Sequence, residues 1–209
     1  MAGKAVRLGS GAPPEIVAQN RAHRRHMVRL YGVGVAGLAL VALTIFLAYD
    51  FYQQHLLDIK RHVAAAYSAY SRGNLGTAEQ QLRGALSLDD GNYTARLDLG
   101  LVLLKDGRYP NAQAELHRAG DINHVATAYL YAGVAALAMN QPRLARTEIA
   151  LALAQAPYDA DVNAVAAMAD RTLGRAAPAA RELATARSYG YAGLTLKGYI
   201  ARAMLEGPD

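Results

Sequence analysis

Two hydrophobic patterns divide this chain. Residues 31–49 form a continuous run of nineteen apolar or small residues that contains no charge. Further along, a small turn residue followed by Ala, an aliphatic residue and a second Ala occurs four times at a nearly constant spacing. The four copies are Gly73, Ala78, Leu82 and Ala85; Gly107, Ala112, Leu116 and Ala119; Asn140, Ala145, Ile149 and Ala152; and Gly174, Ala179, Leu183 and Ala186. A fixed period of about 34 residues predicts a solenoid of helix pairs.

The apolar run has the length of a membrane span. At about 1.5 Å per residue it would extend roughly 28 Å as a helix, close to the hydrocarbon thickness of a bilayer. Tyr31 stands at one end and Tyr49, Phe51 and Tyr52 at the other, as aromatic rings do at membrane interfaces. We therefore predict an uncleaved signal anchor over residues 28–52. A buried core helix is one alternative. A cleaved signal peptide is the other, but about 30 residues precede the run and no small-x-small cleavage site ends it.

The flanking charges predict the orientation of this helix. Four arginines lie between residues 21 and 29, whereas the other flank carries acidic and basic residues together. By the positive-inside rule, residues 1–27 are a cytoplasmic tail and the rest of the chain lies in the periplasm of a bacterium, which places the protein in the inner membrane. Gly32 and Ala36 form one small-xxx-small pair, through which two such helices could associate weakly in the lipid bilayer.

Composition and charge narrow the choice of fold and partner. Ala is abundant and strand-forming residues are not clustered between turn signals, which favours an all-α protein. The net charge is +5, but residues 1–30 carry six basic residues against one Glu, so the remainder is neutral. A neutral folded part does not attract a phosphate backbone, and we expect no nucleic-acid partner. The absence of Cys excludes disulfides and thiolate metal sites.

The repeated segment resembles the tetratricopeptide repeat (TPR) family, in which two antiparallel helices, A and B, form a unit of about 34 residues. The units here would be residues 59–92, 93–125, 126–159 and 160–193. The second unit matches the family pattern best, through Leu99, Gly100, Leu103, Gly107, Tyr109, Ala112, Leu116 and Ala119. The third unit follows with Tyr129, Ala132, Gly133, Ala136, Ala145, Ile149, Ala152 and Pro157, whereas helix A is degenerate in the first and fourth units.

These patterns predict an all-α architecture. One transmembrane helix precedes a right-handed TPR-like α-solenoid of about four helix pairs over residues 53–193. No Gly or Pro occurs between residues 38 and 72, so the anchor helix is expected to run on into the first repeat. Residues 194–209 are predicted to be a capping helix and tail that cover the exposed face of the last repeat. Apolar residues share one face of that helix: Leu196, Tyr199, Ile200, Ala203 and Met204.

The family resemblance implies a concave groove lined by the second, fifth, ninth and twelfth residues of each unit. In the fourth unit these include the polar Asp161 and Arg171. The groove would be mostly apolar, with the binding residues Val63, Tyr67, Tyr70, Leu97, Leu101, Leu104, Leu130, Val134, Leu137 and Met168. Such a surface suits an amphipathic helix or an apolar segment of a protein partner. The alternative is that these residues are ordinary core, packed by neighbouring helices or by the chain's own terminal helix.

No motif in the sequence indicates chemistry. A phosphate-binding loop, a nucleophile elbow and an HExxH motif are all absent. His55, Asp58 and His62 could share a helix face, but solvated residues explain them better than a metal site does. We therefore expect no catalytic residue, no metal and no cofactor.

Together the patterns predict a membrane-anchored TPR scaffold. It would bind a protein partner through the apolar groove and help to assemble or stabilise a membrane or periplasmic complex. The alternative is a permanent accessory subunit of a large respiratory, photosynthetic or secretion complex in the membrane.

Overall fold

The chain divides into two compact units, Met1–Gln54 and His55–Asp209. The structure, a computed structural model, describes residues 14–203 and residue 205; for residues 14–17, 20, 22, 26 and 29 it describes the backbone only. Residues 1–13 of the predicted N-terminal tail, Met204 and residues 206–209 lie outside the described residues. Regular structure in the described part is entirely helical, which confirms the all-α prediction.

The N-terminal unit contains the first part of helix α1 (Pro14–Ser71). Large apolar side chains such as Val33, Phe46 and Leu47 are more than half exposed, and the most apolar window of the helix has no buried residue. A helix buried in a protein core would show the opposite, so the core-helix alternative does not describe this segment. By length and composition alone, the stretch His23–Ser71 could cross a membrane, which is compatible with the predicted anchor.

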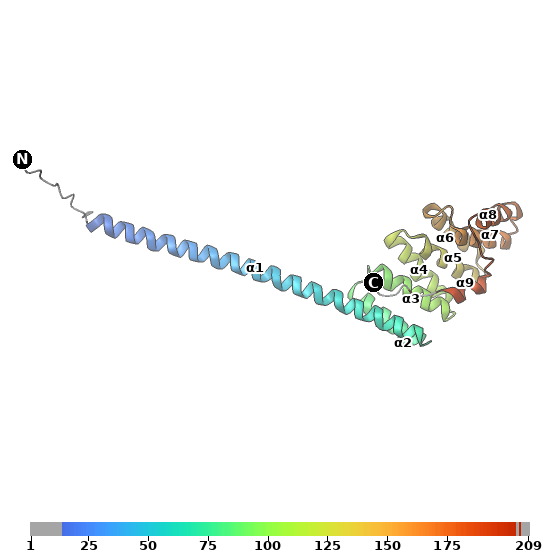
Figure 1. Cartoon of the computed structure of the whole chain (residues 1–209), viewed down its shortest axis with the longest axis horizontal. Coiled ribbons are helices and arrows are strands. Elements are labelled where there is room, and N and C mark those ends of the chain that lie inside the picture. Colours follow the sequence, from blue (N-terminus) through green and yellow to red (C-terminus); the bar gives the residue numbers. More distant parts are fainter. Residues whose placement is uncertain (1–13, 204, 206–209) are drawn as a thin grey trace, which may run out of the picture. The chain divides into compact units, whose positions relative to one another are not determined.

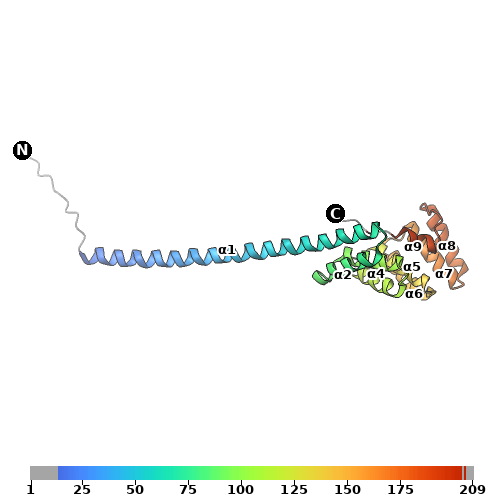
Figure 2. The same ribbon diagram turned by 90° about the horizontal axis from the view of Figure 1, so that it is seen from below.

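Within the described residues, four helix pairs build the C-terminal unit, as predicted. Residues 55–71 of α1 contact α2 (Leu75–Leu88) through hydrogen bonds of His55 and His62 and through a shared apolar cluster. Helix α3 (Tyr93–Lys105) pairs with α4 (Tyr109–Asn123). The third pair is α5 (Ala126–Ala138) with α6 (Pro142–Gln155), and the fourth is α7 (Ala160–Thr172) with α8 (Ala176–Ser188). Helices α2 to α8 follow one another as a stack, seen from two sides in Figures 1 and 2. Each pair packs on the next, which is the arrangement of a solenoid.

Capping residues explain where several of these helices begin. The side chains of Asn74, Asn92 and Asp159 accept hydrogen bonds from backbone N–H groups in the first turns of α2, α3 and α7. Such caps satisfy donors that the start of a helix leaves without an intrahelical partner. Helices α4 and α6 instead carry a proline in their first turn, where its missing N–H costs nothing.

The turn residue of each repeat adopts the left-handed backbone conformation. Gly73, Gly107 and Gly174 have φ of 77°, 78° and 74°, and Asn140 has φ of 56°. Each ends helix A of its repeat, where the chain must reverse within a few residues. The repeated small residue is therefore a helix C-terminal turn, as predicted, and asparagine replaces glycine at the position in the third repeat because it tolerates this conformation best among other residues.

Two Gly→Ala changes test this conformational requirement. Neither Gly107 nor Gly76 has any atom within 4 Å of an added Cβ, but only Gly107 has positive φ. We expect Gly107→Ala to lower the free energy of unfolding by about 1–2 kcal/mol. Gly76 lies within α2, so Gly76→Ala should raise the free energy of unfolding by up to about 1 kcal/mol. Denaturant unfolding of both variants checks the signs, and equal effects would contradict the conformational explanation.

Repeated Ala and Gly residues bring the helices close together. The three alanine–aliphatic–alanine sets of α2, α4 and α6 are all fully buried. Two glycines of the A helices allow a close approach of the paired helix B. A Cβ on Gly100 would lie 2.5 Å from Cγ of Leu116, and one on Gly133 would lie 2.8 Å from Cδ1 of Ile149. The aliphatic residue of helix B thus packs against a bare backbone of helix A, which explains why both appear in the repeat.

The predicted C-terminal helix is present as α9 (Leu196–Arg202), but its main contacts differ from those expected. We expected it to cover the exposed face of the last repeat. Instead, α9 packs mainly against α5 and α3, the A helices of the third and second repeats. In Figure 1 it lies beside α5, although α8 precedes it in the sequence. The C-terminal segment therefore folds back along the surface formed by the A helices.

Candidate functional site

The C-terminal segment changes the environment of the predicted groove residues. Most of them are buried within the chain: Val63, Leu97, Leu101, Leu104, Leu130 and Val134 are each at most 7% exposed. Tyr70, Leu137 and Met168 are half-buried, and only Tyr67 is exposed, at 40%. Partner binding by these ten residues stays a prediction. In this structure the core and the C-terminal segment cover most of their surface.

Helix α9 is held at its centre by one acidic residue of the fourth repeat. Tyr199 is 1% exposed, and its hydroxyl donates to Oδ1 of Asp161 at 2.9 Å. The guanidinium of Arg202 donates to Oδ2 of the same carboxylate at 3.0 Å. Asp161 occupies the second position of its unit, a position that the family resemblance assigns to the groove. One groove carboxylate therefore binds two side chains that lie one turn apart on α9.

Two residues from the first and second repeats hold the end of α9. The Tyr70 hydroxyl donates to the carbonyl oxygen of Ala203 at 2.5 Å. The Lys105 ammonium donates to the carbonyl oxygen of Ala201 at 2.9 Å and lies 5.7 Å from the centre of the Tyr70 ring. Carbonyl groups at a helix C-terminus have no intrahelical partner, so these two donors satisfy acceptors that would otherwise need water. The groove thus contacts both side chains and backbone of the helix.

Burial controls the ionisation of the tyrosines in this region. Burial raises the pKa of Tyr199 well above its usual value of 10, and the hydrogen bond to Asp161 raises it further. Burial also raises the pKa of Tyr191, whose hydroxyl donates to the carbonyl oxygen of Leu194. Both phenols therefore stay neutral and act as hydrogen-bond donors. No ordinary change of pH would release α9 by ionising them.

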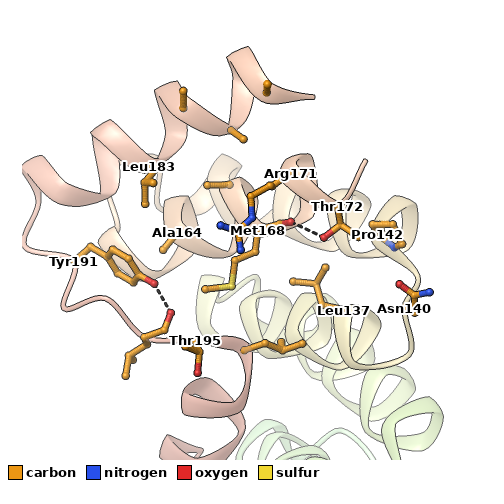
Figure 3. A pocket seen from close by; sticks show the side chains of 16 residues that line it. Leu137, Asn140, Pro142, Ala164, Met168, Arg171, Thr172, Leu183, Tyr191 and Thr195 are labelled. Carbon is orange, nitrogen blue, oxygen red and sulfur yellow. Dashed lines mark hydrogen bonds between the residues drawn. The ribbon is translucent and has the colours of Figure 1, made fainter. Parts of the chain in front are cut away.

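A pocket of about 690 Å³ lies beside α9, between the third and fourth repeats. Figure 3 shows Met168 and Leu137 at its centre, with Leu183 on one side and Tyr191 and Thr195 on another. The lining is mostly apolar, and among the described residues that form it Arg171 alone is charged. Its volume falls in the range that pockets for small molecules usually have. Two of the predicted groove residues, Leu137 and Met168, therefore line an open cavity.

Sequence reasoning missed part of this pocket. Leu183 belongs to the repeated signature, but the aliphatic residues of the other three copies are completely buried, whereas Leu183 is half-buried and lines the pocket. Tyr191, Leu194 and Leu196 form another wall. No motif marks these three residues, because their position depends on how the chain folds back after α8. The sequence gives one indication of the pocket: helix A of the last repeat departs from the family pattern, and in the structure this repeat is incompletely buried.

The histidines of the first repeat make ordinary hydrogen bonds. His55 Nε2 lies 3.0 Å from the carbonyl oxygen of Leu88, and His62 Nδ1 lies 2.9 Å from Oε1 of Gln81. Within the described residues, no group of three or more His, Asp or Glu side chains could hold a metal ion. Gly32 and Ala36 are exposed, and an added Cβ on Gly32 would meet no atom within 4 Å. Helix association through them stays a prediction.

Comparison with known proteins agrees with the repeat pattern. Residues 69–137 match the sequence profile of the family described as tetratricopeptide repeat. A crystal structure of MamA protein aligns with a TM-score of 0.60 and 18% identity, over 63% of this chain and 73% of that one. MamA from Desulfovibrio magneticus RS-1 aligns with a TM-score of 0.59 and 18% identity, over 64% of this chain and 76% of that one. The Arabidopsis OM64 TPR domain aligns with a TM-score of 0.52 and 17% identity, over 56% of this chain and 98% of that domain.

No curated protein matches this chain significantly. At 17–18% identity the structural matches establish the fold alone. The matched residues 69–137, the left-handed turns and the stacked helix pairs show that the chain contains tetratricopeptide repeats and folds as a TPR-like solenoid.

Proposed function

We propose that this protein is a membrane-anchored TPR scaffold without catalytic activity. Its repeats bind a helix or apolar segment of a protein partner on the surface formed by the A helices, and this helps to assemble or stabilise a membrane or periplasmic complex. The N-terminus is cytoplasmic, the anchor lies in a bacterial inner membrane, and the repeats lie in the periplasm. TPR folds are protein-interaction folds, which supports the binding role.

One observation carries the choice of partner. The surface of the A helices already holds an amphipathic helix, α9, through Asp161, Tyr70 and Lys105. An open apolar pocket adjoins that helix, with Met168 and Leu137 in its lining. A partner segment that places two large apolar side chains in this pocket would gain several kcal/mol, at about 1.5–3 kcal/mol for each buried side chain. The exposed apolar side chains of residues 31–49 support the anchor.

Photo-crosslinking in native membranes tests this proposal. The full chain carries a photoreactive amino acid at Met168, in the pocket, or at Arg181, an exposed residue of α8 outside the pocket lining. We expect the chain to stay with the membrane fraction after carbonate extraction. We also expect Met168 to crosslink to one protein repeatedly, with a yield at least tenfold above that at Arg181.

A pair of Ala→Arg variants provides the control. Ala180 is exposed and lines the pocket, so Ala180→Arg should fill the pocket without disturbing the core and should lower the crosslinking yield at Met168 by about tenfold. Ala150 is exposed on α6 and lies outside the pocket lining, so Ala150→Arg should leave the yield unchanged. Extraction by carbonate would contradict the anchor. Equal yields in the two variants would contradict binding at the pocket.

A further inference from the structure

Helix α9 is a separate element placed on the repeats. Residues 189–195 connect it to α8, and Gly190 and Gly193 in this connection have φ of 90° and 79°. The residues that hold it, Lys105 and Tyr70, are 96 and 133 positions away in the sequence from their acceptors. A repeat solenoid is built from contacts between sequence neighbours. The contacts of α9 do not follow that rule and instead resemble those of a bound ligand.

The geometry is that of a helix bound in a groove. Within α9, Tyr199 is buried and Leu196 and Ile200 are half-buried against the same cluster, whereas Lys197 and Ala201 are exposed. Ala203 and Leu205, which follow the helix, are also buried. The buried side chains belong to the same apolar cluster as Leu101, Leu104 and Val134. An amphipathic helix that inserts one face into an apolar groove is a recurring mode of peptide recognition. The predicted groove is therefore a helix-binding surface, and the chain's own C-terminal segment occupies it.

This segment is short enough to exchange. Helix α9 has seven residues, and an isolated helix of that length is unstable in water, so its helical state depends on the groove. The short connection to α8 raises the local concentration of the segment to about the millimolar range, which compensates for a weak intrinsic affinity. A partner helix must therefore outcompete the segment at that effective concentration, or it must bind a chain whose C-terminal segment has already left the groove.

We propose that residues 196–205 are an intramolecular ligand of the groove and that a partner helix of the same chemistry replaces them. This inference rests on the proposed function and names its partner class. The partner is an amphipathic helix with a tyrosine at the position of Tyr199 and a cation three residues later, both of which bind Asp161. Its last carbonyl groups receive hydrogen bonds from Tyr70 and Lys105. Until such a helix binds, the C-terminal segment keeps the apolar groove away from water.

Peptide exchange on the full chain tests this proposal. The chain is purified in detergent with a protease site inserted between Gly190 and Gly193, and the probe is a fluorescent peptide with the sequence of residues 194–205. After cleavage, we expect the probe to bind with measurable affinity as the native segment dissociates. The uncleaved chain should bind it at least tenfold more weakly, because the tethered segment competes. Fluorescence anisotropy measures both.

Two peptide variants make the test specific. Tyr199→Ala in the probe removes a buried side chain and the hydrogen bond to Asp161, so its affinity should fall at least tenfold. Lys197→Ala changes an exposed residue of the same helix and should leave the affinity unchanged. The proposal is overturned if the cleaved chain keeps its native segment and excludes the probe, if cleavage abolishes cooperative unfolding, or if intact and cleaved chains bind the probe equally.

The outcome is separable from that of the proposed function. Peptide exchange uses only this chain, whereas crosslinking at Met168 reports on a partner in the membrane. If exchange fails while Met168 still captures its partner, the repeats are a scaffold whose C-terminal helix is permanent. If exchange succeeds and nothing is captured at Met168, the groove binds its own segment and the proposed partner site is wrong.

Discussion

Leu101→Asp is expected to unfold the repeat unit. Leu101 is 2% exposed and belongs to the main apolar cluster, so a carboxyl group there would have no water around it. Full burial raises the pKa of a carboxyl group by up to about 3–5 units, and each unit corresponds to 1.36 kcal/mol. The free energy of unfolding should therefore fall by up to about 4–7 kcal/mol. A whole domain is stabilised by about 5–15 kcal/mol. The cooperative unfolding transition in denaturant should therefore be lost or shifted to very low concentration.

Leu101→Met is the matched control for this change. It conserves volume and apolar character, so we expect it to cost less than about 1.5 kcal/mol. If Leu101→Asp kept the stability of the unchanged chain, the residue would have to be exposed to solvent in a groove that α9 leaves open. The same reasoning applies to Val134, which is completely buried. Charged substitutions at these two positions therefore test the core, and the pocket residue Ala180 is the proper place to test partner binding.

Leu116→Ala and Leu183→Ala are expected to differ strongly although they change the same position of two repeats. Leu116 is completely buried against Gly100, so its truncation leaves a cavity and should cost about 3–5 kcal/mol. Leu183 is half-buried and lines a pocket that already exists. Little new cavity forms there, and we expect a cost of about 1–2 kcal/mol.

Denaturant unfolding of the full chain under one set of conditions measures this pair. The difference in the free energy of unfolding between Leu116→Ala and Leu183→Ala should be the same whether unfolding is followed by circular dichroism, which reports helical content, or by a measurement of compactness. Repeat proteins can unfold in steps, so agreement between probes is needed before a single free energy is assigned. Equal losses for the two variants would mean that the pocket beside Leu183 closes in solution and that the fourth repeat packs like the second.

Local rules made the helix pairs predictable. The turn residues Gly73, Gly107 and Gly174, together with Asn140, share the one backbone conformation that the end of helix A requires, and the chain repeats that requirement at a nearly constant spacing. The buried alanines recur because two helices cross at the same place in every repeat. Since all contacts within such a pair lie within one repeat of the sequence, a pattern of that period contains nearly all the information about the pair.

The location of α9 was not predictable in the same way. Its sequence predicts an amphipathic helix, and that prediction is confirmed. However, an apolar helix face can cover the end of the last repeat or fill the groove, and both choices bury similar side chains. Tyr199 and Asp161 are 38 residues apart, and no periodic pattern links them. The bond between them, and the bonds from Tyr70 and Lys105, exist only because the chain reverses after α8.

The sequence by itself determined the helical content, the repeat period, the turns between paired helices and the presence of an exposed apolar stretch near the N-terminus. These follow from side-chain volume and backbone preference, which act between residues close in the chain. Only the tertiary structure decided which predicted groove residues are buried and which line an open pocket. That outcome depends on where the C-terminal segment finds its partners, and long-range packing of this kind leaves no local pattern in the sequence.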